Sequence, residues 1–179
     1  MGDFRPYTDA ELEQQERDQQ DPKWLEWVQP ERMNAQIDKF LNETVPDMPD
    51  NPWSAEGLDH AERAALAIFP DINATKKPEN RDVADQFHRY IGEVFRRSFE
   101  GSWYNVPDSD DRGHGFEPAI RLPYTDIYSE VISNLTVAVH RKTGKEWSWI
   151  FDRNKESYAE WVQGGRLPLS QWIDAQEAR

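Results

Sequence analysis

The chain has 179 residues, 34 of them acidic and 21 basic, which gives a formal net charge of −13 at pH 7. This length suits one domain, with or without an N-terminal extension. A strongly acidic field repels nucleic-acid phosphates and anionic membranes, so neither is an expected partner. The sequence contains no cysteine, which excludes disulfides and thiolate chemistry. It also lacks an apolar leader segment or a membrane-length apolar run, so we expect a cytoplasmic protein.

Hydrophobic residues make up only 37% of the chain, but eight Trp, eight Phe and six Tyr are among them. Because each buried aromatic ring removes a large area from water, we expect a core rich in aromatic residues. The acidity is uneven, since residues 1–60 hold 15 acidic and 5 basic side chains. Such a surface speeds encounter with a basic partner, although an acidic surface also simply keeps a protein in solution.

The N-terminal third predicts short helices. Thr8 followed by Glu11 forms a capping-box pattern, and Pro30 suits the first turn of a helix. Three prolines between residues 45 and 53 exclude regular structure there. The predicted elements are a helix over 9–20, an aromatic anchor over 22–28, a helix over 30–42 and a loop over 45–53.

The central part predicts two longer helices. Ser54 caps the first helix, which Pro70 ends, and a loop follows over residues 71–77. The longest helix spans residues 78–99, with apolar side chains along one side and Gly101 as its C-terminal cap.

The remaining sequence predicts a small sheet followed by helices. Ser102–Val106 is a predicted strand, and Asp108–Gly115 is a turn. The further expected elements are strands over 118–122 and 127–131, a helix from 132 ended by Gly144, short helices over 147–151 and 158–162, and a last helix capped by Ser170. The predicted fold class is therefore α+β: mostly helical, with one small antiparallel sheet of two to three strands packed by a long amphipathic helix. We divide it into an acidic helical extension over 1–53 and a core domain over 54–179, which together form one compact unit.

No sequence motif predicts a cofactor or a metal. The loop that begins at Asp108 has acidic residues where a calcium-binding EF-hand loop begins, but Arg112 and Ala119 stand where oxygen ligands belong. We therefore predict a solvated hairpin loop and no metal site. The glycine-rich, zinc-protease and serine-hydrolase motifs are absent from the sequence, so we predict no catalytic residues.

Charged residues on the long helix allow two interpretations. Asp85 and His88 share a helix face, as do Arg89 and Glu93. Asp85 could orient His88 as a general base, but exposed ion pairs are the favoured interpretation. A second set, Arg96, Arg97 and Arg121, could form an anion site, although Glu93, Glu100 and Glu117 are close enough in sequence to neutralise it.

Aromatic residues gather in and around the predicted sheet. Side chains alternate along a strand, so Trp103 and Tyr104 point to opposite faces. One face belongs to the core, and the other is either a partner surface or covered by helices. A pocket between the long helix and the sheet is the alternative prediction, with ligand-binding residues His88, Arg96, Trp103, Tyr104, Arg121 and Tyr124.

The order of motifs over residues 80–140 resembles a known pattern. Tyr90-Ile-Gly-Glu-Val-Phe95 is followed by Gly101-Ser-Trp-Tyr-Asn-Val106 and then by Pro118-Ala-Ile-Arg-Leu-Pro123. This order is similar to small bacterial, notably actinobacterial, proteins of unknown function, some of which are grouped with immunity proteins of polymorphic toxin systems. The resemblance implies an α+β domain that neutralises another protein, and it carries no catalytic residues.

These observations lead to three functional hypotheses. The first is a non-enzymatic protein-binding module, of the immunity or regulatory type, that engages a basic partner. The second is a small-ligand-binding protein or enzyme that uses the predicted pocket. The third is a homodimer packed through the aromatic face of the sheet.

Overall fold

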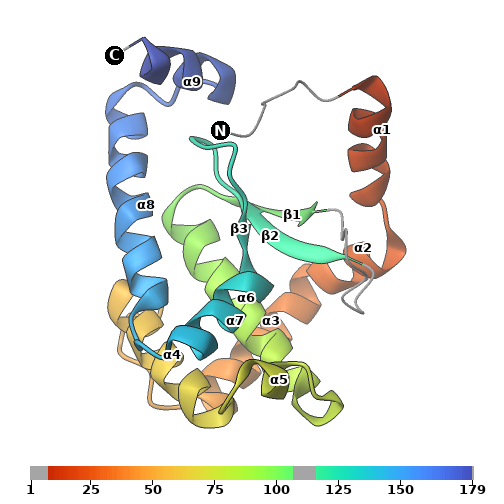
Figure 1. The fold of residues 1–179 in the computed structure, drawn as a ribbon, viewed down its shortest axis with the longest axis vertical. Coiled ribbons are helices and arrows are strands. Elements are labelled where there is room, and N and C mark those ends of the chain that lie inside the picture. Colours follow the sequence, from red (N-terminus) through yellow and green to blue (C-terminus); the bar gives the residue numbers. More distant parts are fainter. Residues whose placement is uncertain (1–7, 107–115, 179) are drawn as a thin grey trace.

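The computed structural model describes residues 8–106 and 116–178, and its architecture is mostly helical around one three-stranded antiparallel sheet. This confirms the predicted α+β class. In Figure 1, α8 stands along one side of the molecule and α1 along the other, with the sheet between them. The predicted turn Asp108–Gly115 lies outside the described residues.

The elements follow in chain order, with the sheet inserted between the sixth and seventh α-helices. The helices are α1 (Asp9–Asp18), α2 (Pro22–Val28), α3 (Pro30–Lys39), a π-helical segment (Phe40–Thr44), α4 (Ala55–Ile68), α5 (Ile72–Thr75), a 3-10 turn (Pro78–Asn80), α6 (Arg81–Ser98), α7 (Val131–Arg141), α8 (Glu146–Gln163) and α9 (Leu169–Glu177). The strands are β1 (Ser102–Val106), β2 (Glu117–Arg121) and β3 (Ser129–Glu130).

Several predicted helix starts are confirmed by their capping geometry. Thr8 and Glu11 form a reciprocal capping box at α1. Ser54 accepts a hydrogen bond from the backbone N–H of Gly57 at the start of α4. Pro30 occupies the first turn of α3, where its missing N–H is harmless. These caps satisfy backbone donors that helix starts otherwise leave unpaired.

Some predicted boundaries are wrong. Residues 71–77 are not all loop, because Asp71 caps the short α5 through the N–H of Ala74. The two short helices predicted over 147–151 and 158–162 are parts of one helix, α8. Ser170 makes no cap and lies inside α9, which Pro168 precedes.

Two glycines do not play the capping roles predicted for them. Glu100 adopts the left-handed conformation after α6 (φ 54°), and the N–H of Gly101 then reaches the carbonyl of Arg96 at 3.0 Å. Gly101 is needed for close approach instead, because a Cβ there would lie 2.7 Å from Ile120 Cγ2. Lys142 is the left-handed residue directly after α7, and Gly144, which also has a positive φ, lies two residues further on.

Helix α6 is the centre of the molecule. Residues 86–95 are all buried, so this helix is enclosed on every side rather than along the one apolar stripe that the sequence predicts. It contacts the N-terminal helix α3, the helices α4 and α7, and strands β1 and β2. One hydrophobic cluster around it joins residues from both predicted segments, among them Trp27 and Ile37 from 1–53 and Phe87 and Val139 from 54–179.

The sheet is ordered β1-β2-β3, with both neighbouring pairs antiparallel. Trp103 lies opposite Ile120, and Asn105 lies opposite Pro118. β3 is shorter than predicted, because only Ser129 and Glu130 pair with β2 before α7 begins. β1 and β2 both contact α6, so the Trp103 side of the sheet rests on the central helix.

The contact between α6 and the sheet depends on a glycine. A Cβ at Gly92 would overlap the indole ring of Trp103, so only glycine lets that ring lie against the helix. We expect Gly92→Ala to lower the free energy of unfolding by about 1–3 kcal/mol, because the overpacked ring must move. Urea denaturation monitored by circular dichroism measures this change.

A double-mutant cycle provides the control. In a Trp103→Leu background the overlapping ring is absent, so the added methyl group should cost much less there. Equal costs of Gly92→Ala in both backgrounds would contradict this account of the contact.

Candidate functional site

The structure places the six predicted ligand-binding residues in different surroundings. Arg96 lies on α6 and Trp103 on β1, and both donate hydrogen bonds to the buried carboxylate of Glu93. His88 is also buried, with 7% of its surface exposed. The interface between α6 and the sheet is therefore packed with side chains at the place where the sequence predicts a pocket.

Glu93 is the polar centre of that interface. Only 3% of its side chain is exposed, and it accepts hydrogen bonds from Arg96 at 2.7 Å, Arg97 at 2.9 Å and Trp103 Nε1 at 2.9 Å. Burial alone would raise the pKa of Glu93. The hydrogen bonds from Arg96, Arg97 and Trp103, with the charge of Arg96, outweigh that effect, so the net pKa is lowered and the carboxyl stays ionised. Arg96 and Arg97 are thus both paired with the Glu93 carboxylate, as expected if these arginines do not form an anion site.

The predicted pairing of Arg89 with Glu93 is wrong. Arg89 instead binds Asp85 at 2.7 Å, and it also donates to the backbone carbonyl of Trp27 at 2.8 Å. Trp27 Nε1 donates to the same Asp85 carboxylate at 2.6 Å. The pair is not the exposed one expected on a helix surface, because 1% of the Arg89 side chain is exposed. It joins α2 to α6 inside the molecule.

Tyr104 and Arg121 lie at the sheet but not against α6. Tyr104 stacks on Tyr128 with ring centroids 5.1 Å apart, and Arg121 Cζ is 5.9 Å from the Tyr104 ring centre. The Tyr104 hydroxyl reaches Gln15 of α1 at 3.4 Å. Partial cover by these neighbours leaves Tyr104 half-buried.

A pocket of about 610 Å³ lies on another side of the sheet, between the segment that joins β2 to α7 and helices α7, α8 and α9. Of the six predicted residues, Tyr124 alone lines it. Its lining is polar with several aromatic and aliphatic side chains: Leu122, Tyr124, Thr125, Ile127, Tyr128, Ser129, Glu130, Ser133, Asn134, Ile150, Arg153, Asn154, Glu156, Ser157, Glu160, Trp172 and Gln176.

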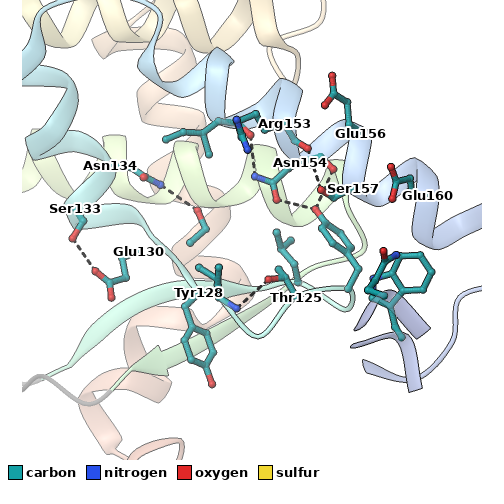
Figure 2. A pocket seen from close by; sticks show the side chains of 17 residues that line it. Thr125, Tyr128, Glu130, Ser133, Asn134, Arg153, Asn154, Glu156, Ser157 and Glu160 are labelled. Atoms are coloured by element: carbon teal, nitrogen blue, oxygen red, sulfur yellow. Dashed lines mark hydrogen bonds between the residues drawn. The ribbon is translucent and has the colours of Figure 1, made fainter. Parts of the chain in front are cut away.

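Hydrogen bonds between neighbouring elements fix the pocket walls. Tyr124 donates from its hydroxyl to Asn154 Oδ1 at 3.0 Å, which joins the segment after β2 to α8. Ser133 donates to Glu130 at 2.8 Å at the start of α7. Figure 2 shows Glu130 and Ser133 on one side of the pocket and Glu160 on the other. Burial raises the pKa of the Tyr124 phenol, so this hydroxyl remains a donor at neutral pH.

The pocket lining is acidic. Glu130, Glu156 and Glu160 contribute three carboxylates, whereas Arg153 is the one arginine or lysine among the lining residues. Arg153 also lies over the Trp149 ring, with Cζ 5.0 Å from the ring centre. The lining can therefore attract a cation and offer it carboxylate and hydroxyl oxygens.

Two exposed apolar side chains flank the pocket. Ile127 lines it and is 74% exposed, and Trp149 is 57% exposed one helical turn before Arg153. Tryptophan is enriched among the residues that anchor protein interfaces, so Trp149 is a candidate anchor beside this concave site.

A buried carboxylate fixes the start of α8. Glu62 of α4 is fully buried and accepts a hydrogen bond from the backbone N–H of Trp147 at 2.9 Å. Glu62 therefore caps α8 from another helix. In most helices a side chain directly before the first turn makes this hydrogen bond. Burial raises the pKa of Glu62, and the backbone hydrogen bonds oppose this effect only in part.

The described residues contain no group of three His, Asp or Glu side chains placed to hold a metal ion. None of the described helices is both long and apolar enough to span a bilayer. A scan against protein-family models, a search of curated proteins and a search of solved structures found no match to this chain.

Sequence reasoning missed the pocket because it divided α8 into two helices. Trp149, Arg153, Glu156 and Glu160 follow one another at spacings of four, three and four residues, which places them along one face of a continuous helix. That signal is present in the sequence. The facing wall, from Thr125 to Glu130, has no comparable pattern.

The two buried glutamates should give opposite pH dependences of stability. The pKa of Glu93 is lowered from its usual value of 4.5, so its stabilising effect is present above that value and is lost as the pH falls through the lowered pKa. We expect Glu93→Gln to lower the unfolding free energy by about 1–2 kcal/mol at neutral pH, and by less as the solution is acidified. Urea titrations between neutral and acidic pH test this.

Glu62→Gln is the matched contrast. The pKa of Glu62 is raised from 4.5, so the wild-type protein loses stability as the pH rises from that value through the raised pKa. The variant avoids this loss, and its stability relative to the wild type should therefore improve as the pH rises. Parallel pH profiles for the two variants would contradict both assignments.

Proposed function

We propose that this protein is a non-enzymatic binding module of the immunity or regulatory type, and that a basic partner protein docks over the pocket between α7 and α8. The observation that carries this proposal is the acidic lining of the pocket, with the exposed side chains of Ile127 and Trp149 beside it. Charge attracts the partner and sets its orientation, while apolar contact and shape hold it.

The charge of the whole chain supports a basic partner. A net charge of −13 creates a long-range field that accelerates encounter with a positively charged protein. At the pocket, Glu156 and Glu160 lie on an exposed stretch of α8, and Glu130 is half-buried on the facing wall. Lysine or arginine side chains entering between these walls would meet carboxylates from both sides.

The dimensions also support a protein segment as the occupant. From Trp149 to Glu160 the α8 face extends eleven residues, about 16 Å at the α-helical rise. An extended segment of about five residues, or a loop of similar length, spans that distance. The tryptophan at one end would supply an apolar anchor for it.

A small-molecule ligand is the second candidate, and the pocket volume favours it. About 610 Å³ lies within the usual range for small-ligand sites, and the lining offers hydroxyl, amide and carboxylate groups. This candidate replaces the predicted pocket between α6 and the sheet with the pocket that contains Tyr124.

The partner proposal is tested by capture and charge reversal. We expect the wild-type chain to capture a basic protein from the native cell at low salt, and the complex to dissociate as salt is raised. With the captured partner purified, Glu156→Lys/Glu160→Lys should reduce its association rate at least about tenfold. Stopped-flow fluorescence at two salt concentrations measures this rate.

The control has the same net charge. Glu31→Lys/Asp38→Lys reverses two exposed acids on α3, away from the pocket lining. It should slow association only through the weaker overall field. If both double variants slow association equally, the partner is attracted by net charge and does not dock at the pocket.

The small-ligand candidate predicts a thermal shift. A ligand that fills the pocket stabilises the folded chain and raises its melting temperature by mass action. Ser157→Trp should abolish that shift, since Ser157 lines the pocket and a large side chain there would occupy it. A screen of metabolites that leaves the melting temperature unmoved removes this candidate.

A further inference from the structure

The outer edge of the sheet is covered by a side chain that imitates a peptide group. β1 is an edge strand, because the sheet order is β1-β2-β3. Gln19, just after α1, donates from Nε2 to the Asn105 carbonyl at 2.7 Å and accepts from the Asn105 N–H at Oε1 at 2.9 Å. A carboxamide has the same donor and acceptor as a backbone peptide unit, so Gln19 makes the pair of bonds that a neighbouring strand would make.

The strand register shows which backbone groups of β1 point outward and are not bonded to β2. Asn105 lies opposite Pro118, which has no N–H to donate, and the backbone groups of Asn105 point away from β2 toward Gln19. In an antiparallel ladder this orientation repeats every second residue. Trp103 therefore presents its backbone groups along the same outer edge, two residues before Asn105.

Among the described residues, polar contacts join helix α1 to this edge. None of its residues is buried, and Leu12 is 46% exposed. Besides the bonds of Gln19, hydrogen bonds join Asn105 Nδ2 to the Asp18 carbonyl at 2.8 Å and the Tyr104 hydroxyl to Gln15 at 3.4 Å. The Asp18 Oδ2 atom is buried without a hydrogen-bond partner, which is unfavourable. Tertiary packing of apolar side chains stabilises most helices in proteins, and α1 has little of it, so α1 separates from its surface at little energetic expense.

We propose that the outer edge of β1 is a second binding surface, which accepts an extended, basic segment of a partner protein as a fourth strand when α1 is displaced. Backbone bonds to Asn105 and Trp103 would replace those of Gln19. This surface is separate from the pocket between α7 and α8, so the failure of either proposal leaves the other standing.

The charges favour a basic segment over a second copy of this chain. α1 carries five acidic residues and one arginine, and it remains tethered beside the edge after displacement. Two copies that paired through β1 would bring together chains of net charge −13 each, so their repulsion opposes self-pairing. A segment that alternates basic and apolar residues suits both the edge and the released helix.

The test compares wild type with Gln19→Ala, using as probe a synthetic peptide of alternating lysine and valine. Gln19→Ala removes both bonds that cover Asn105. A larger fraction of the variant therefore has the β1 edge exposed before the peptide is added, and the apparent affinity rises with that fraction. We expect the variant to bind the peptide about tenfold more tightly than the wild type, as measured by fluorescence anisotropy. Gln19→Glu keeps the acceptor and loses the donor, and it should fall between them.

Amide hydrogen exchange locates the peptide. The Asn105 N–H should exchange faster in Gln19→Ala than in wild type, and the bound peptide should slow it again. Gln20→Ala is the matched control, because it changes the neighbouring glutamine and leaves the two bonds from Gln19 in place. It should bind the peptide as the wild type does.

Three outcomes would overturn the proposal. The first is equal affinity of the peptide for wild type and Gln19→Ala. The second is equal binding of a peptide with proline at alternate positions, which cannot complete a strand ladder. The third is a concentration-dependent doubling of mass of Gln19→Ala in sedimentation, with no peptide binding, which would make a second copy the occupant.

Discussion

The fold depends on satisfying two charged side chains within a helix that has no exposed face over residues 86–95. Burying a charge is costly unless opposite charge and hydrogen bonds compensate it. Arg89 is compensated by Asp85 of the same helix and donates to the Trp27 carbonyl of α2. Glu93 is compensated by Arg96 and Arg97 of the same helix and accepts from Trp103 of β1. The charged groups of one helix therefore fix the positions of the two structures packed against it.

This arrangement explains why the arginines of α6 are poor candidates for ligand binding. Arg96 and Arg97 both bind Glu93, and Arg97 also lies over the Trp53 ring with Cζ 4.0 Å from its centre. A ligand that took either arginine would leave the buried Glu93 carboxylate less compensated. A cluster of charged residues near a strand can thus have a structural role without binding a ligand. The sequence does not show this, because the role depends on which residues lie beside the cluster in three dimensions.

The sequence predicts local structure here better than it predicts which faces meet. The capping box at Thr8, the cap at Ser54 and the strand Ser102–Val106 depend on neighbouring residues, and all three are confirmed. The start of α8 depends partly on Glu62, which lies far away in the chain and accepts a hydrogen bond from the Trp147 N–H, so no local pattern predicts this cap. One wall of the pocket follows from helical spacing along α8, but no short-range pattern predicts that residues 125–130 lie against it.

The two proposed binding surfaces share a property that follows from the central helix. With α6 enclosed, its polar groups are used internally, and contacts with other molecules fall to elements at the periphery. Helix α8, which forms one pocket wall, and helix α1, which precedes Gln19, lie on opposite sides of the sheet (Figure 1). The pocket presents glutamate carboxylates beside hydroxyl groups. The β1 edge presents backbone groups beside the acidic side chains of α1. A partner with a basic surface would therefore meet two separate acidic sites on a core that need not change when either is occupied.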